Sequence, residues 1–180
     1  VACTPDRLMG VDSRLPWKHN AADMRIFLIN TVSKWLVMTR ATYNGIDRRA
    51  FKYRKVLVVY ARDEGQFDFT QPNTVFMRVT DPANIVTEIE EFIELEEALS
   101  PFSSDVMICG GPTLYREFLT KTDKCDQILL SIIDDTCEYP PDARMYYLDE
   151  FHPNYELHER KTMDNQCTFE LHTRSSITCG

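Results

Sequence analysis

Two side chains suited to binding and protonating a ring system lie close together near the start of this sequence, Trp17 and Asp23. Trp17 closes residues 10–17, in which polar residues give way to the apolar corner Leu15-Pro16-Trp17, and Asp23 follows six residues later. Loops over binding sites often carry function, and a carboxyl group partly removed from water holds its proton more tightly. Such a proton can be passed to a bound heterocycle. The sequence therefore predicts a sheltered pocket with Asp23 as its acid and with Trp17 and Leu15 at its edge.

The element that positions Asp23 is predicted to be a helix that begins after Asn20. Asn20 is a suitable N-cap, and residues 21–28 are favourable or tolerated in a helix. Helical positions four apart share one face, so Phe27 accompanies Asp23, and the neighbouring face carries Met24, Leu28 and Thr31. A second interpretation stays open, in which Asp23 only pairs with Asn20 at the helix start and favours the helix dipole.

Length and charge limit the classes of protein to which this chain can belong. Its 180 residues predict a single domain over residues 1–180, large enough to bury a core. The net charge of −8 argues against nucleic acid as a partner, so an anionic ligand must be held by a local basic cluster. No apolar run approaches the roughly 18 residues of a membrane helix, and no secretory signal is visible. We expect a cytoplasmic protein that acts on a small molecule.

Neither cysteine nor histidine spacing indicates a metal site. No CxxC pair occurs among the six cysteines, which are Cys3, Cys109, Cys125, Cys137, Cys167 and Cys179. Without a secretion signal, cysteines in a chain of this size predict free thiols in a reducing compartment. The four histidines form no cluster with carboxylates at ligand spacing, so we expect no bound metal.

Strand and helix patterns alternate along the chain without a linker or a repeat. Short apolar runs predict buried strands at residues 36–38, 56–59, 105–109 and 128–133. A long helix is predicted to open at Asp81-Pro82, with an acidic, solvated outer face and with Ile85, Ile89, Phe92, Ile93 and Leu99 on its inner side. Another helix follows Gly110-Gly111-Pro112, and residues 155–161 and 166–174 predict an antiparallel hairpin. We expect a three-layer α/β fold: a mostly parallel twisted sheet, a C-terminal hairpin, and helices on both faces.

These segments, in this order, resemble the dihydrofolate reductase family over nearly the whole chain. Each fragment alone is weak, and the specificity lies in their order. The resemblance rests on Val1-Ala2, residues 10–17, the Asp23 helix with Met24, Phe27 and Thr31, residues 37–43, residues 54–58, residues 108–115, Ser131 and residues 167–171. In the family these are the first strand, a mobile loop beside the nicotinamide, the substrate helix, a strand and turn at the cofactor phosphates, an arginine-led strand, the double-glycine motif, a hydroxyl that supports the acid, and the last strand.

The resemblance implies a reaction and a set of site residues. It implies that Asp23 assists protonation of N5 of 7,8-dihydrofolate while NADPH supplies a hydride. The implied catalytic residues are Asp23, Trp17 and Leu15. The implied substrate contacts are Ala2, Met24, Phe27, Ile46, Phe51, Cys109, Ser131 and Arg54, the last of which binds a carboxylate of the glutamate tail. The implied cofactor contacts are Ala2, Met9, Gly10, Arg40, Ala41, Thr42, Arg62, Gly110, Gly111, Pro112, Thr113, Leu114 and Tyr115.

The resemblance also implies a monomer of the cytoplasm that serves tetrahydrofolate biosynthesis and binds antifolate inhibitors. It places Val1 close to the family's first motif, which predicts that a few residues precede it. Two departures concern the cofactor. Thr39 stands where a glycine is usual, and Tyr60-Ala61-Arg62 stands where serine or threonine would contact the adenosine 2′-phosphate, with Arg62 as an electrostatic substitute.

Other interpretations stay open at this point. The chain fits a binding protein derived from the reductase that has lost turnover, or a pyrimidine reductase of riboflavin synthesis on the same fold. Locally, Gly110-Gly111-Pro112 is a common transition from strand to helix, and Trp17 suits core packing. The basic stretch Arg48, Arg49, Lys52, Arg54 and Lys55 suits a solvated loop or a weak nucleic-acid patch.

Overall fold

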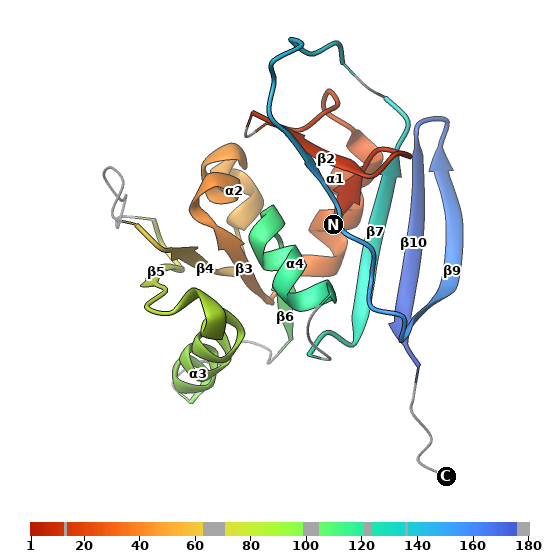
Figure 1. Ribbon diagram of the computed structural model, residues 1–180. Coiled ribbons are helices and arrows are strands. Elements are labelled where there is room, and N and C mark those ends of the chain that lie inside the picture. Colours follow the sequence, from red (N-terminus) through yellow and green to blue (C-terminus); the bar gives the residue numbers. More distant parts are fainter. Residues whose placement is uncertain (13, 63–70, 99–104, 121–123, 136, 176–180) are drawn as a thin grey trace. The chain divides into compact units, whose positions relative to one another are not determined.

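The protein is described by a computed structural model that covers residues 1–12, 14–62, 71–98, 105–120, 124–135 and 137–175 (Figure 1). It divides into two compact units. Unit 1 contains Val1–Phe27 and Phe118–Gly180, and unit 2 contains Leu28–Glu117. The single domain over residues 1–180 stays a prediction, and each unit is described by itself.

Unit 2 is built on a four-stranded parallel sheet. Its strands are β3 (Trp35–Thr39), β4 (Lys55–Tyr60), β5 (Thr74–Arg78) and β6 (Val106–Ile108), in the order β5-β4-β3-β6. The apolar runs at residues 36–38 and 56–58 are fully buried, as expected for strands covered on both faces. The run at 105–109 does form a strand, but Val106 is 37% exposed because β6 is the last strand of this sheet. The predicted strand is confirmed, but the burial predicted for it was wrong at Val106.

Helices of unit 2 connect these parallel strands. Helix α2 (Arg40–Gly45) and the 3-10 turn η1 (Arg48–Phe51) join β3 to β4, whereas η2 (Pro82–Asn84) and α3 (Ile85–Glu97) lead from β5 toward β6. The two connections run in opposite directions across the sheet. Right-handed crossovers therefore place α2 and α3 on opposite faces, as Figure 1 shows.

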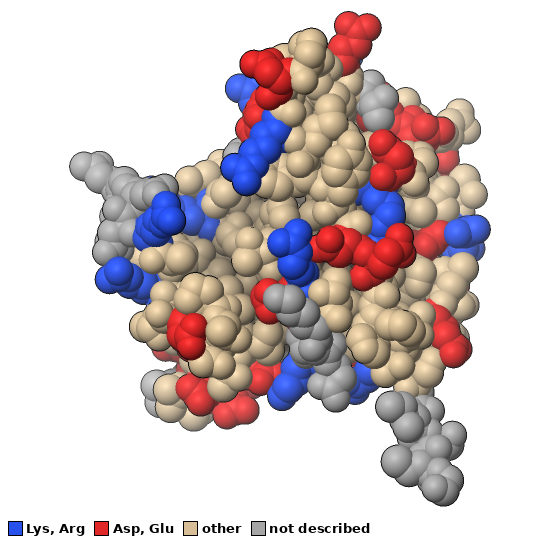
Figure 2. All heavy atoms as spheres, viewed as in Figure 1, with Lys and Arg blue, Asp and Glu red and all other residues tan. Residues whose placement is uncertain are grey.

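The predicted helix is confirmed, but its opening at Asp81-Pro82 is the 3-10 helix η2, and α3 itself begins at Ile85. The Asp81 side chain accepts a hydrogen bond from the Ala83 N–H at 3.0 Å, and Ile85, Ile89 and Ile93 are buried. Figure 2 shows acidic side chains gathered over the outer surface of this helix, in agreement with the predicted solvated face. Phe92 is half-buried, and Leu99 lies outside the described residues.

Unit 1 contains a mixed sheet in the order β1-β7-β10-β9. Strand β1 (Ala2–Cys3) pairs in parallel with β7 (Gln127–Ile133), and β10 (Cys167–Arg174) pairs antiparallel with both β7 and β9 (Tyr155–Asp164). The predicted C-terminal hairpin is thereby confirmed. A second, two-stranded sheet joins β2 (Leu8–Val11) to β8 (Met145–Tyr147). Both of these strands are too short to show a clear alternation, and they were not predicted.

Two helices belong partly to each unit. Helix α1 (Ala21–Thr31) gives residues 21–27 to unit 1 and 28–31 to unit 2, and α4 (Pro112–Thr120) is divided after Glu117. The described helices include none with the length and apolar character needed to span a membrane.

Candidate active site

The start of α1 holds Asp23 in place. The Asn20 side-chain oxygen accepts a hydrogen bond from the Asp23 N–H at 2.9 Å, and the Asn20 carbonyl accepts one from Met24 at 3.1 Å. Asn20 is therefore the N-cap that the sequence predicts, and it leaves the half-buried Asp23 carboxylate in the first helical turn. Capping thus involves the backbone of Asp23 and does not occupy its side chain. Met24 and Phe27, the other predicted contacts on this helix, are also half-buried.

Apolar side chains from unit 1 pack around Trp17. Only 5% of Trp17 is exposed, and it forms a cluster with the buried Ile133 and Cys167. Partly buried apolar residues complete the cluster, namely Ala2, Ala22, Ile26 and Met163. Since Ala22 and Ile26 flank Asp23 on α1, this cluster fixes the helix start against the sheet. Core packing of Trp17 is therefore observed, and its contact with a ligand stays a prediction.

The loop before Trp17 is fastened at its proline. The Pro16 carbonyl accepts hydrogen bonds from the Cys137 N–H, at 3.0 Å, and from the Tyr139 hydroxyl. Leu15, in contrast, is 60% exposed. The loop thus presents one large apolar side chain outward, next to a residue whose backbone is held from two positions.

Cys167 lies beside Asp23 and was missed as a site residue. Burial raises the pKa of the Cys167 thiol to about 11, and the negative charges of Asp23 and Asp164 add to this rise. The thiol is therefore protonated at neutral pH, a small neutral neighbour for the acid. Its place in the last predicted strand was the one signal available, because strand register decides which side chain faces the helix.

Ser131 and Ala2 meet on neighbouring strands of unit 1. They are register partners between β7 and β1, and the Ser131 N–H donates to the Val1 carbonyl at 2.9 Å. Ser131 is 3% exposed. On β2, Met9 is buried and Gly10 is half-buried opposite Tyr146, with room for a Cβ 3.7 Å from its nearest neighbours. Packing in unit 1 therefore does not require the glycine at position 10.

In unit 2, Arg54 is buried and bonded to the last turns of α1. It is 5% exposed, and its Nε donates to the Thr31 hydroxyl and its Nη2 to the Leu28 carbonyl, both at 2.7 Å. Its Nη1 donates to the Lys52 carbonyl at 2.6 Å. Burial lowers the pKa of Arg54, although the guanidinium remains charged at neutral pH. A positive charge is thereby fixed in a defined orientation, which suits recognition of a carboxylate.

The double glycine is surrounded by side chains of unit 2. Gly110 has φ +101°, and a Cβ there would lie 2.9 Å from the Tyr115 ring. A Cβ on Gly111 would lie 3.2 Å from the Thr42 hydroxyl and 3.3 Å from the Thr39 hydroxyl. Gly110 therefore requires glycine by both conformation and space, whereas a Cβ at Gly111 would press on two hydroxyls that would have to shift. The double glycine between β6 and α4 is therefore closely packed, and Tyr115, a predicted cofactor contact, is one of its neighbours.

Residues predicted to contact cofactor phosphates lie mainly at the starts of two helices. Arg40, Ala41 and Thr42 form the first turn of α2, where the sequence predicted a turn, and Pro112 and Thr113 begin α4. Arg40 and Thr42 are half-buried, whereas Ala41, Arg62 and Thr113 are exposed and Leu114 is fully buried. Leu114 thus packs in the core, and only its backbone amide remains suited to a ligand.

Cys109 is half-buried, and its predicted contact with substrate stays a prediction. Burial raises the pKa of Cys109 to about 12, and its Sγ donates to the Met107 carbonyl at 3.4 Å. Chemistry that needs a thiolate is excluded at this position.

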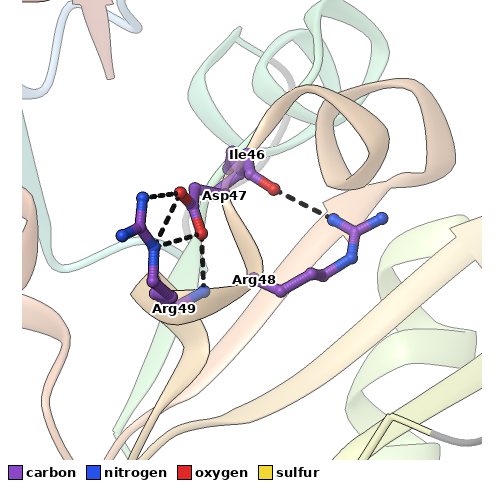
Figure 3. Close-up of polar contacts among 4 residues, drawn as sticks. All are labelled: Ile46, Asp47, Arg48 and Arg49. Atoms are coloured by element: carbon purple, nitrogen blue, oxygen red, sulfur yellow. Dashed lines mark hydrogen bonds and ion pairs between the residues drawn. The ribbon is translucent and has the colours of Figure 1, made fainter.

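Side chains between the end of α2 and β4 contact one another and nearby residues of α2. The Phe51 ring is buried and stacked on Tyr43, with centroids 5.3 Å apart, and Ile46 caps the end of α2. Arg48 lies over the Tyr43 ring at 3.7 Å and donates to the Ile46 carbonyl at 3.0 Å. Figure 3 shows Arg49 directed instead at the Asp47 carboxylate, with an Nε–Oδ2 distance of 2.9 Å. These two arginines are engaged locally, which argues against a nucleic-acid patch.

Comparison with known proteins identifies the family. Residues 1–175 match the sequence profile of dihydrofolate reductase. The chain belongs to the dihydrofolate reductase family. It is 30% identical over 115 residues to the dihydrofolate reductase of Enterococcus faecium, an alignment that covers 64% of this chain and 59% of that protein. It is 28% identical over 125 residues to the Haemophilus influenzae enzyme of the same name, covering 69% and 65% of the two chains.

These alignments span about three fifths of the length of the two relatives. A solved structure of dihydrofolate reductase from Enterococcus faecalis, complexed with NADP(H) and RAB-propyl, matches with a TM-score of 0.69 at 20% identity. That match covers 97% of this chain and 94% of the other. The predicted family and the predicted α/β fold are thereby confirmed, and the low identities agree with a divergent member.

Proposed function

We propose that this chain is an NADPH-dependent reductase of 7,8-dihydrofolate. The observation that carries the proposal is the half-buried Asp23 at a capped helix start, packed beside Trp17, in a chain of the dihydrofolate reductase family. The net reaction adds a hydride to C6 and a proton to N5, which reduces the bond between these ring atoms and oxidises the nicotinamide. NADPH, when bound, supplies the hydride.

Asp23 is the residue that assists protonation of N5. Its side chain is not used by the N-cap, so it remains available to the amidine edge of a pterin and to a water molecule that protonates N5. Trp17 limits the access of water from one side, and the exposed Leu15 covers the ring when substrate is present. The neutral Cys167 thiol behind Asp23 adds no competing charge.

Arg54 is proposed to bind a carboxylate of the glutamate tail. Its three hydrogen bonds to protein oxygens hold the guanidinium plane before a ligand arrives, so little side-chain entropy is lost on binding. Thr31 contributes through Arg54, as the acceptor that orients Nε.

The residues of unit 2 fit a dinucleotide. Gly111 lets backbone approach closely where any Cβ would meet Thr39 and Thr42, and α4 opens directly after it with backbone N–H groups. Arg40 and Arg62 supply positive charge toward phosphate, and Tyr115 contacts the nicotinamide. The solved relative complexed with NADP(H) supports this assignment.

The first experiment is NADPH oxidation on addition of dihydrofolate, followed by absorbance, for wild type, Asp23→Asn and the control Asp164→Asn. Asp164 is exposed in unit 1, and asparagine keeps the oxygen that accepts from Gln166. We expect Asp23→Asn to lose about 10²–10⁴-fold in turnover near neutral pH, with a smaller loss in acid, and Asp164→Asn to behave as wild type. Full activity of Asp23→Asn across pH would refute its assigned role.

Two predictions separate this proposal from its alternatives. A binding protein without turnover would not oxidise NADPH although it is folded, and a pyrimidine reductase would act on a riboflavin precursor in place of dihydrofolate. Stabilisation by NADPH against thermal unfolding tests cofactor binding independently of turnover. We further propose that the protein acts in the cytoplasm as a monomer, on a small molecule and with sensitivity to antifolates.

A further inference from the structure

Thr39 lies at a junction between the sheet and two helices of unit 2. The Gly111 N–H donates to the Thr39 hydroxyl oxygen at 3.1 Å, and the Thr39 N–H donates to the Gly110 carbonyl at 2.7 Å. The Thr39 hydroxyl is also 3.2 Å from the Thr42 hydroxyl. Since Gly111 is buried, its N–H depends on the acceptor that Thr39 provides.

The hydrogen bonds of Gly111, Thr39 and Thr42 have a preferred direction of donation. An amide N–H can only donate, so the Thr39 oxygen is the acceptor from Gly111. A hydroxyl that accepts a hydrogen bond is polarised into a better donor, and the direction that continues the chain runs from Thr39 to Thr42. Thr42 then accepts from Thr39 and keeps its own proton for another acceptor. Thr42 is half-buried in the first turn of α2, beside Arg40.

We propose that Thr39 is a positioning residue that makes the Thr42 hydroxyl a hydrogen-bond donor toward the pyrophosphate of the dinucleotide. The inference rests on the proposed function for the identity of that ligand. Phosphate oxygens only accept hydrogen bonds, so a hydroxyl with a fixed donor role binds them better than one that must reorient. Glycine at 111 is part of this device, because a Cβ would press on both hydroxyl oxygens.

A double-mutant cycle tests whether Thr39 acts through Thr42. The variants are Thr39→Val, Thr42→Val and the double variant, with Thr39→Ser as the conservative change that keeps the hydroxyl. Thr87→Val, on an exposed position of α3, is the matched control. The readout is the Kd of NADPH from fluorescence titration without dihydrofolate, together with the Kd of dihydrofolate and the thermal unfolding of the free protein.

We expect Thr39→Val and Thr42→Val each to weaken NADPH binding about three- to tenfold, the range for loss of one hydrogen bond. The double variant should bind no more than about twofold more weakly than Thr42→Val, since the effect of Thr39 passes through Thr42. Thr39→Ser and Thr87→Val should resemble wild type, and dihydrofolate affinity should not change. If Thr39→Val does not fold, Thr39→Ala replaces it in the cycle.

Multiplied losses in the double variant, or NADPH binding by Thr39→Val equal to wild type, would overturn the inference. Equal weakening of dihydrofolate and NADPH would also overturn it, because a general structural role would be sufficient. If wild type does not reduce dihydrofolate and the NADPH cycle still shows coupling, the proposed function fails and the role of Thr39 stands. If wild type is active and the cycle shows no coupling, the proposed function stands and the role of Thr39 fails.

Discussion

Among the described glycines, Gly110 is the one whose replacement by alanine should lower the free energy of unfolding most. Its φ of +101° is rarely adopted by residues with a side chain, and a Cβ would lie 2.9 Å from Cε2 and 3.1 Å from Cζ of Tyr115. The backbone cannot simply rotate away, because the Gly110 carbonyl accepts a 2.7 Å hydrogen bond from Thr39. Backbone strain of about 1–3 kcal/mol and crowding of about 1–3 kcal/mol together predict a loss of about 2–6 kcal/mol for Gly110→Ala.

Urea unfolding measures this loss, with Gly45→Ala as the matched control. Gly45 ends α2, and a Cβ there has no neighbour within 4 Å among the described atoms, so its change should stay within about 0.5 kcal/mol. Gly111→Ala should fall between the two, because its Cβ would meet hydroxyls at 3.2 and 3.3 Å without the unfavourable φ. The same urea midpoint for Gly110→Ala and Gly45→Ala, at unchanged slope, would refute the reasoning.

Two further predictions follow from buried ionic groups. Thr31→Val removes the acceptor for Arg54 Nε and nearly preserves the shape of the side chain. We expect KM for dihydrofolate to rise roughly 10-fold or more, while the Kd of NADPH stays constant. Parallel changes in both constants would contradict the role of Arg54. At Glu170, burial alone would raise the pKa, but hydrogen bonds from His172 and Arg160 and their positive charges outweigh it and hold the pKa below its ordinary value of 4.5. The contribution of ionised Glu170 to the free energy of unfolding is therefore present above pH 4.5 and is lost as pH falls through the lower pKa of the folded state. The urea midpoint of wild type should therefore fall more steeply on acidification than that of Glu170→Gln.

Features that depend on local sequence were predictable. The Asn20 side-chain oxygen caps α1 by accepting from the Asp23 N–H three residues later, so this cap needs no distant partner. The apolar runs of β3 and β4 are buried on both faces, and continuous apolar runs are typical of parallel strands covered by helices.

Features that depend on register and on distant partners were not predictable. Cys167 faces Trp17 because of its position in β10, and a shift of one residue would turn it to the opposite face. Glu170, also on β10, is buried and held by Arg160 on β9 and His172 on its own strand, a pairing that appears only when the hairpin is formed. Residues 40–45 form helix α2, whereas the family resemblance led us to expect a strand and turn over residues 37–43; six residues give too little periodicity to predict a helix.

The structure accommodates a threonine side chain at position 39, where the family resemblance led us to expect glycine. A side chain in place of glycine at the end of β3 needs space and a partner for its hydroxyl, and here the Gly111 N–H and the Thr42 hydroxyl provide both. A Cβ at Gly111 would crowd both hydroxyls, at 3.2 and 3.3 Å. Positions 39, 42 and 111 are therefore coupled: alanine at 111 displaces the hydroxyls, and valine at 39 leaves a buried N–H without its acceptor.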